Sequence, residues 1–148
     1  MQTYRNLDVW KLAHALTLRL YRDTATVPKQ ESYGLTGQIR RAASSIGANI
    51  AEGCGRGTDG ELRQSLQFAM GSATELDNHL LPARDLGFLD SDTYAARLED
   101  VTRIQKMLSR SSLSCARRQG RRPDAQQKAS SSSERPTANS QQPTANSQ

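Results

Sequence analysis

Hydrophobic residues recur every three or four positions through most of the first 110 residues, which is the spacing of an amphipathic helix. Four segments have this pattern and predict helices over about residues 8–24, 33–53, 59–86 and 91–109. We find no segment with the alternating pattern of a strand. Because the connections are short, the predicted fold class is all-α, an antiparallel up-down-up-down four-helix bundle.

The segment over residues 33–53 has three faces of different chemistry. Its apolar face predicts a core stripe of Leu35, Ile39, Ala42, Ile46 and Ile50. Beside this stripe, Ala43, Gly47 and Ala51 form a row of small side chains that would let another backbone approach closely. Glycine inside a helix costs about 1 kcal/mol relative to alanine, so Gly47 indicates a packing role.

The third face of this segment is polar and consists of Arg41, Ser45, Asn49 and Glu52. Two interpretations remain open, a solvated surface or a hydrogen-bonded network at a contact between helices or subunits. Arg40 and Arg41 are candidates to pair with carboxylates of a neighbour or with phosphate.

The other three segments also contain apolar stripes, bounded by capping signals. The stripes are Val9, Leu12, Ala13, Leu16 and Leu20; Leu62, Leu66, Ala69, Ala73, Leu76 and Leu80; and Tyr94, Leu98, Val101, Ile104 and Leu108. We expect the second helix to start near Ser32, the third at Thr58 or Asp59 and the fourth at Asp90 or Ser91. Pro82 lacks an amide donor and predicts a bend near Leu81, followed by a loose final turn.

Three aromatic residues lie to the side of these stripes. Trp10 and Tyr21 are about 100° from the first stripe and Phe68 is about 120° from the third. Trp10 either covers the edge of the bundle or packs against another subunit. Together with the small residues, they define a candidate oligomer interface: Trp10, Tyr21, Ala43, Gly47, Ala51 and Phe68.

The sequence also contains an extended motif. The runs YGLT at 33–36, QIRRAA at 38–43, SI at 45–46 and ANIAEG at 48–53 resemble the central motif of a bacterial four-helix-bundle family. That family is named after proteins encoded within intervening sequences of 23S ribosomal RNA genes. Further matches include LDVW at 7–10 and Leu86-Gly87, and the resemblance covers about residues 3–108. Val27 and Pro82 depart from the family pattern.

This resemblance implies a cytosolic, all-α homo-oligomer that forms a ring, with five as the expected number of subunits. It implies no established biochemical activity. The amino terminus has no apolar signal core, and no apolar run is long enough to span a membrane, so we expect a cytoplasmic location.

Composition and charge divide the chain near residue 110. The net charge is +5, of which +1 belongs to residues 1–110 and +4 to residues 111–148. We therefore predict a bundle domain over 1–110 and a disordered, basic tail rich in Ser, Gln and Pro over 111–148. The tail contains the repeat PTANSQ at 136–141 and 143–148. Its arginines are either solvated, the interpretation we favour, or in salt-sensitive contact with RNA phosphates.

Residues suited to catalysis do not form a recognisable set. His14 and His79 lie on different predicted helices, and the two cysteines, Cys54 and Cys115, have no metal-binding spacing. The run GCGRG at 53–57 lacks the lysine of a nucleotide-binding loop. We therefore expect no enzyme activity, catalytic residue, metal or cofactor.

The sequence supports two hypotheses about function. The first is a structural or scaffolding homo-oligomer with itself as partner. The alternative is an RNA- or DNA-associated protein that uses Arg40, Arg41 and the basic tail.

Overall fold

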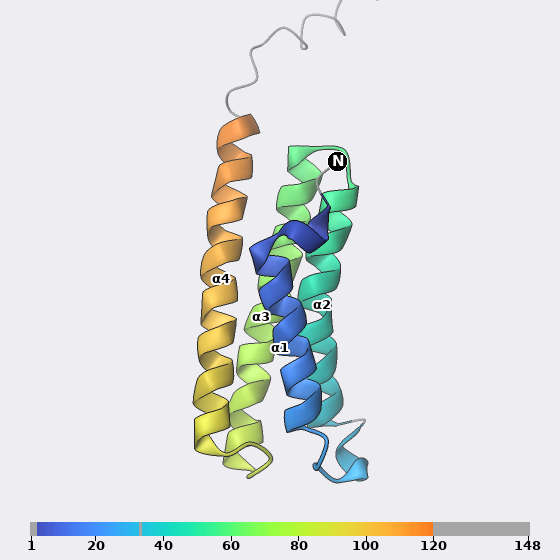
Figure 1. The fold of residues 1–148 in the computed structure, drawn as a ribbon, viewed down its shortest axis with the longest axis vertical. Helices are drawn as coiled ribbons and strands as arrows, with labels where there is room; N and C mark the ends of the chain where they lie inside the picture. The colour runs from blue at the N-terminus through green and yellow to red at the C-terminus, as the bar shows by residue number, and fades with distance from the viewer. Residues whose placement is uncertain (1–2, 33, 120–148) are drawn as a thin grey trace, which may run out of the picture.

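The computed structural model describes residues 3–32 and 34–119. Its helices are α1 (Asp8–Asp23), α2 (Leu35–Gly55), α3 (Asp59–Asp85) and α4 (Ser91–Gln119), with short 3-10 helices η1 (Tyr4–Asn6) and η2 (Lys29–Ser32). The four α-helices run alternately down and up (Figure 1). The described residues contain no strand, so the predicted all-α four-helix bundle is confirmed. The tail from residue 120 onward, including the PTANSQ repeat, lies outside the described residues.

Side-chain caps fix the starts of α3 and α4, as predicted. The Thr58 hydroxyl oxygen accepts a hydrogen bond from the Glu61 amide at 3.2 Å and donates to the Glu61 carboxylate at 2.8 Å. The first bond is the N-cap half of a capping box, whereas the Glu61 carboxylate accepts from the Thr58 hydroxyl and not from the Thr58 amide. Asp90 accepts a hydrogen bond from the Thr93 amide at 2.9 Å.

The predicted start of the second helix near Ser32 was wrong. The helix begins at Leu35, with Gly34 as the N-cap residue and no side-chain cap. Ser32 instead ends η2, because the chain makes a 3-10 turn before it enters α2. Tyr33 lies outside the described residues.

The core lies along the bundle axis and is formed by all four helices. Of the predicted stripe residues, Leu12, Leu35, Leu62, Tyr94 and Leu98 are partly buried, and the others are buried. Full burial of each leucine or isoleucine contributes about 1.5–3 kcal/mol before conformational entropy is counted. The hydrophobic period was therefore a sufficient guide to the core.

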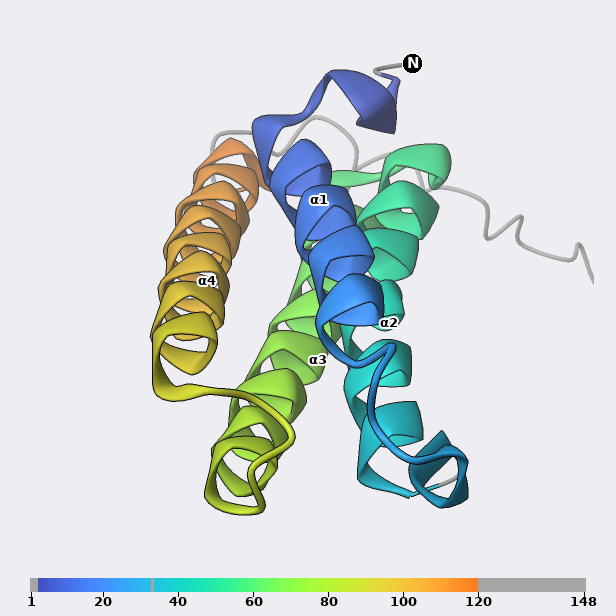
Figure 2. The same cartoon turned by 60° about the horizontal axis from the view of Figure 1, so that its bottom comes forward.

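Helix α1 is the shortest helix and is held against α4 by two ion pairs. Arg19 Nη1 lies 2.9 Å from Asp100 Oδ2, and Arg97 Nε lies 2.6 Å from Asp23 Oδ2. The hydrogen bond that Arg97 donates to the Asp23 carboxylate raises the pKa of the Arg97 guanidinium above its ordinary value. Figure 2 shows α1 between α2 and α4, with α3 behind it.

The predicted end of the fourth helix at residue 109 was wrong, because α4 continues to Gln119. Cys115 lies seven residues after Leu108, two turns along the same face, and it is buried in the core cluster. The intervening residues include no proline or glycine to stop the helix. The packed region therefore extends past the predicted domain boundary at residue 110.

Pro82 does not end α3, which runs through it to Asp85. The missing amide leaves the Asn78 carbonyl without its helical partner, and Asn78 is exposed, so water can replace that bond. The final turn is not loose, because Ala83 is fully buried and its carbonyl accepts bonds from the Phe88 and Leu89 amides.

Candidate functional site

The small-residue flank of α2 packs against α1 of the same chain. Ala43 has no exposed surface. A Cβ atom built on Gly47 would lie 3.5 Å from Trp10 Nε1, so the absence of a side chain at Gly47 leaves room for the indole ring. Ala51 is partly exposed. Two members of the predicted oligomer interface are thus covered by other parts of the same chain: Ala43 is buried in the core, and Gly47 lies against Trp10.

Trp10 covers the edge of the bundle within this chain, at the border between α1 and α2. Its indole is stacked on His14 with ring centroids 5.0 Å apart and meets Tyr4 edge-on at 5.0 Å. Trp10 is partly buried against the core cluster. His14 is exposed and covers one side of the indole ring.

Arg40 joins α2 to the end of α1. Its Nε donates to the Thr24 hydroxyl oxygen at 3.0 Å and its Nη2 donates to the Thr24 carbonyl at 3.2 Å. The guanidinium also lies over the ring of Tyr21, 4.7 Å from its centroid. Arg40 therefore has partners within its own chain, whereas the sequence suggested a phosphate or a neighbouring carboxylate. The Tyr21 side chain remains 47% exposed despite its contact with Arg40.

The polar face of α2 makes local contacts. Asn49 Nδ2 donates to the Ser45 carbonyl at 2.8 Å, and Glu52 is paired with Arg56 one turn later. Arg41 is exposed. Both contacts join residues one turn apart on α2 or at its end. The polar face therefore makes no bond to another described helix of the chain through Ser45, Asn49 or Glu52.

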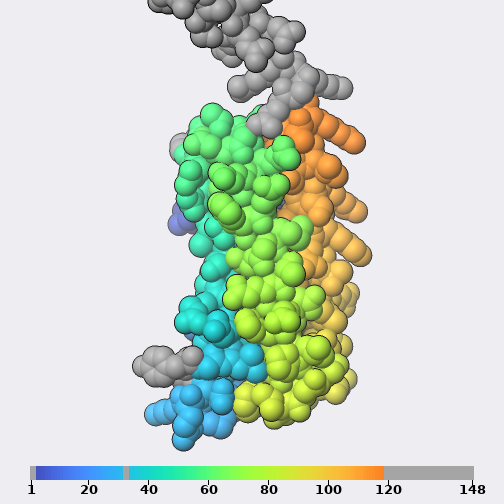
Figure 3. Space-filling model, turned by 180° about the vertical axis from the view of Figure 1, so that it is seen from behind, coloured from blue at the N-terminus to red at the C-terminus, as the bar shows by residue number. Residues whose placement is uncertain are grey.

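Phe68 lies on the outer flank of α3 and is 58% exposed. It is about 160° around the helix from Met70, which lines a groove against α4. Leu86, on the same flank five turns later, is 64% exposed. Phe68 is about 60° around α3 from Ser65, which meets Gly53 of α2, so this flank is on the α2 side of α3. Figure 3 shows α2 and α3 side by side on one face of the molecule.

Helices α2 and α3 approach closely at one point. A Cβ atom on Gly53 would lie only 2.7 Å from the Cβ atom of Ser65 and 3.0 Å from Leu62 Cδ1. Gly53 and Ser65 are both buried. The glycine at position 53 therefore has a structural reason that the sequence pattern did not reveal.

The two cysteines lie at one cavity, which sequence reasoning missed. Cys54 and Cys115 both line a space of about 200 Å³ near the ends of α2 and α4. Burial, and then the neighbouring Cys115, raises the pKa of the Cys54 thiol. Arg118 Nη2 donates to Cys115 Sγ at 3.2 Å. The seven-residue spacing from Leu108 to Cys115 was the available signal.

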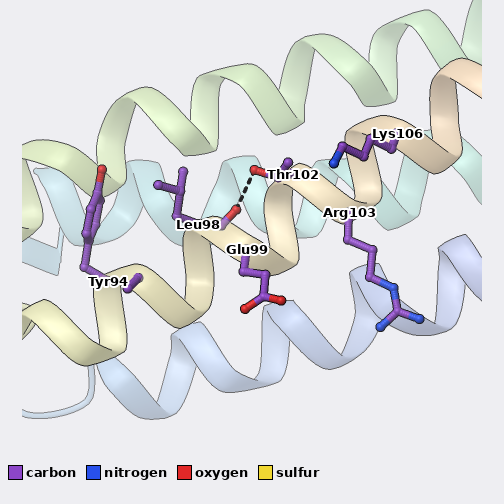
Figure 4. Close-up of a pocket in the computed structure, with 7 residues that line it drawn as sticks. Tyr94, Leu98, Glu99, Thr102, Arg103 and Lys106 are labelled. Carbon is purple, nitrogen blue, oxygen red and sulfur yellow. Dashed lines mark hydrogen bonds between the residues drawn. The ribbon is translucent and has the colours of Figure 1, made fainter.

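Helix α4 has an open hollow on its outer side. The hollow has a volume of about 550 Å³ and is lined by Tyr94, Ala95, Leu98, Glu99, Thr102, Arg103 and Lys106. Figure 4 shows Arg103 and Lys106 projecting from the helix, and the Thr102 hydroxyl donating to the Leu98 carbonyl at 2.9 Å. The Thr102 hydroxyl is thus satisfied within the helix.

The described residues contain no cluster of metal ligands. Within 3–32 and 34–119 there is no group of three or more His, Cys, Asp or Glu side chains suited to hold a metal ion. His79 has one acidic neighbour, Glu75, at 3.5 Å. None of the helices in this part of the chain has the length and apolarity needed to cross a membrane.

These observations define a small all-α bundle whose candidate sites are exposed surfaces of its helices. The family model described as 23S rRNA-intervening sequence protein matches residues 5–110. The chain belongs to this family, which confirms the resemblance in the sequence. The recognised motif and the observed bundle thus agree.

A solved structure supports the fold. A crystal structure from Bacteroides thetaiotaomicron, titled a protein with unknown function from the S23 ribosomal protein family, has a TM-score of 0.61 and 24% identity. The match covers 68% of this chain and 94% of that one. A comparison with curated proteins finds no match. Neither the family description nor this title indicates an enzymatic activity.

Proposed function

We propose that this protein is a non-enzymatic, self-assembling scaffold of the cytoplasm whose partner is a further copy of itself. The observation that supports this proposal is the exposure of Phe68 and Leu86 on one flank of α3. A large aromatic side chain that a monomer leaves in water loses the stabilisation that burial would provide, about 1.5–3 kcal/mol. Contact with a second copy would recover it.

The flank that contains Phe68 has neighbours suited to a subunit contact. The adjacent face of α2 presents Arg41, Ser45, Asn49 and Glu52, of which Ser45 and Asn49 are partly buried. Interfaces commonly combine an aromatic centre with a polar rim. We therefore place the contact on the α2–α3 face, with Phe68 at its centre, and retain five as the expected number of subunits.

The native mass of the full chain tests this proposal. We expect wild-type protein to have a mass several times the 16.3 kDa of one chain, five times in a pentamer. Phe68→Glu places a charge at the contact and should reduce the mass towards that of one chain. Leu18→Glu is the matched control, because Leu18 is also exposed, at 43%, and lies on the outer side of α1.

Each outcome is informative, provided that circular dichroism shows unchanged helix content. Loss of assembly in Phe68→Glu alone supports the α2–α3 contact. A wild-type mass of one chain at micromolar concentration refutes self-assembly, and an unchanged mass in Phe68→Glu refutes the position of the contact.

The alternative function, association with nucleic acid through Arg40 and Arg41, is not favoured at that position. Arg40 is bound to Thr24 and lies over Tyr21. Arg41 is the member of the pair that has no ion-pair partner among residues 3–32 and 34–119.

A further inference from the structure

Positive charge is concentrated in the second half of α4. Residues 101–119 contain five Lys or Arg residues and no Asp or Glu. Residues 1–100 contain eleven Lys or Arg and thirteen Asp or Glu, which gives a net charge of −2. The second half of one helix thus has a net charge of +5, and the chain before it is slightly acidic. The ten residues of α4 beyond the predicted helix end are part of this basic segment.

Four of the five basic residues share one strip of the helix surface. They are Arg103, Lys106, Arg110 and Arg117, and all four are exposed. At 100° per residue they fall within an arc of about 60°, opposite the buried positions of Val101, Ile104 and Leu108. The basic strip, as we call these four residues, extends about 21 Å along the helix axis at 1.5 Å per residue.

Local structure does not explain the basic strip. None of its four residues has a carboxylate within ion-pair distance in the described part of the chain, whereas five other arginines do: Arg19, Arg56, Arg84, Arg97 and Arg118. Favourable interaction with the helix dipole is restricted to the last turn, so it cannot account for Arg103, Lys106 or Arg110. Like charges three or four residues apart destabilise a helix by a few tenths of a kcal/mol. The strip therefore opposes stability in the isolated chain.

We propose that the basic strip of α4 binds the phosphate backbone of a nucleic acid. A linear row of cations matches a linear polyanion. The phosphates of one duplex strand are about 3.4 Å apart along the axis, so the strip spans about six of them. Arginine provides a planar fork of donors that fits phosphate oxygens. Arg103 and Lys106 lie at one end of the hollow on α4, and Glu99 lines its other part, so the phosphates would follow the strip from Arg103 towards Arg117.

A membrane surface fits the strip less well. Helices that bind at a membrane interface insert an apolar face among the lipids. The apolar face of α4 is already buried in the bundle, with Val101 and Ile104 fully covered. Leu113, which is 61% exposed, lies beside the strip, but one leucine is not the broad apolar face of an interfacial helix. Attraction to phosphate along one line is typical of sequence-independent binding to nucleic acid.

The test is a fluorescence-anisotropy titration of a labelled RNA stem-loop with full-length protein at 0.05 M and 0.2 M salt. The strip variant is Arg103→Gln/Lys106→Gln/Arg110→Gln. The matched control is Arg22→Gln/Lys29→Gln/Arg63→Gln, which removes three exposed cations from other helices and turns. Both variants have the same net charge and retain the tail. Circular dichroism checks that each remains folded.

The expected result follows from counterion release. Four phosphate contacts predict a loss of wild-type affinity of about 50- to 150-fold between the two salt concentrations. The strip variant should reduce the slope of log affinity against log salt by about 2 to 3, and the control should leave it unchanged.

Three results would overturn the proposal. The first is absence of wild-type binding at the lower salt concentration. The second is an equal loss of affinity in the two variants, which would assign binding to net charge or to the tail. The third comes from titrating the same proteins with phosphatidylserine vesicles. If the strip variant loses binding to the vesicles but keeps binding to RNA, the partner of the strip is a membrane.

Discussion

Two glycines inside α2 are expected to respond oppositely to one added methyl group. In Gly47→Ala the new Cβ atom lies 3.5 Å from Trp10 Nε1, an ordinary van der Waals distance. The substitution should therefore stabilise the protein by the difference in helix propensity, about 1 kcal/mol. In Gly53→Ala the new atom lies 2.7 Å from Ser65 Cβ. Since Ser65 Cβ is fixed by the α3 backbone, the two helices must separate.

The expected change in the free energy of unfolding for Gly53→Ala is the difference between two effects. Overpacking a buried site typically costs about 1–3 kcal/mol, and the gain in propensity offsets about 1 kcal/mol of it. A net destabilisation of about 1 kcal/mol follows. With an unfolding entropy of about 2.1 cal/mol/K per residue over the described residues, each kcal/mol shifts Tm by roughly 4 °C. The two variants should therefore differ by roughly 8 °C.

Thermal denaturation followed by circular dichroism measures this difference. All variants must be compared at one protein concentration, because self-association makes Tm depend on concentration. Gly71→Ala is the control, since a Cβ atom there meets nothing within 4 Å and should report the gain in propensity alone. If Gly53→Ala is as stable as Gly71→Ala, the close approach of α2 and α3 at Gly53 is refuted.

The remaining predictions concern Arg40 and Asp90. Arg40→Ala removes both hydrogen bonds to the buried Thr24 and should lower the free energy of unfolding by about 2 kcal/mol in urea denaturation; wild-type stability would contradict this role. The Thr93 amide, followed by its hydroxyl, lowers the pKa of Asp90 below its ordinary value. Because the folded-state pKa is the lower one, the Asp90 contribution is present above the unfolded-state pKa and is lost as pH falls through the folded-state value. Tm of wild type should therefore fall more steeply in this acidic range than Tm of Asp90→Asn, which retains a capping oxygen, and parallel curves would refute the assignment.

The sequence was sufficient to predict the fold because hydrophobic period, capping residues and the family motif all agreed. The end of α4 was missed for a specific reason. Between Leu108 and Cys115 the next helical core positions, Ser111 and Ser112, are serines and only partly buried, so the apolar period appeared to end. A cysteine is a common buried residue, but one apolar position two turns away is a weak signal.

The contacts of the candidate site depended on geometry that a sequence does not specify. A helical wheel placed Trp10 beside the core stripe, but the neighbour on that side depends on how α1 crosses α2. Arg40 reaches Thr24, sixteen positions earlier in the chain, and this contact requires the turn between the helices to bring the end of α1 alongside α2. The side of a helix on which a residue lies can therefore be predicted from sequence more readily than the residues that it contacts.

The two proposed surfaces are compatible in one assembly because they lie on different helices. Contact through the α2–α3 face, with Phe68 at its centre, leaves the outer side of α4 in water. Four cations on one chain give only weak binding at physiological salt. Several copies in one assembly present several basic strips, and once the first strip is bound, the others reach the same nucleic acid at a high effective concentration. Self-assembly would thus convert a weak, sequence-independent contact into a useful affinity, which gives the scaffold and the basic strip a common physical purpose.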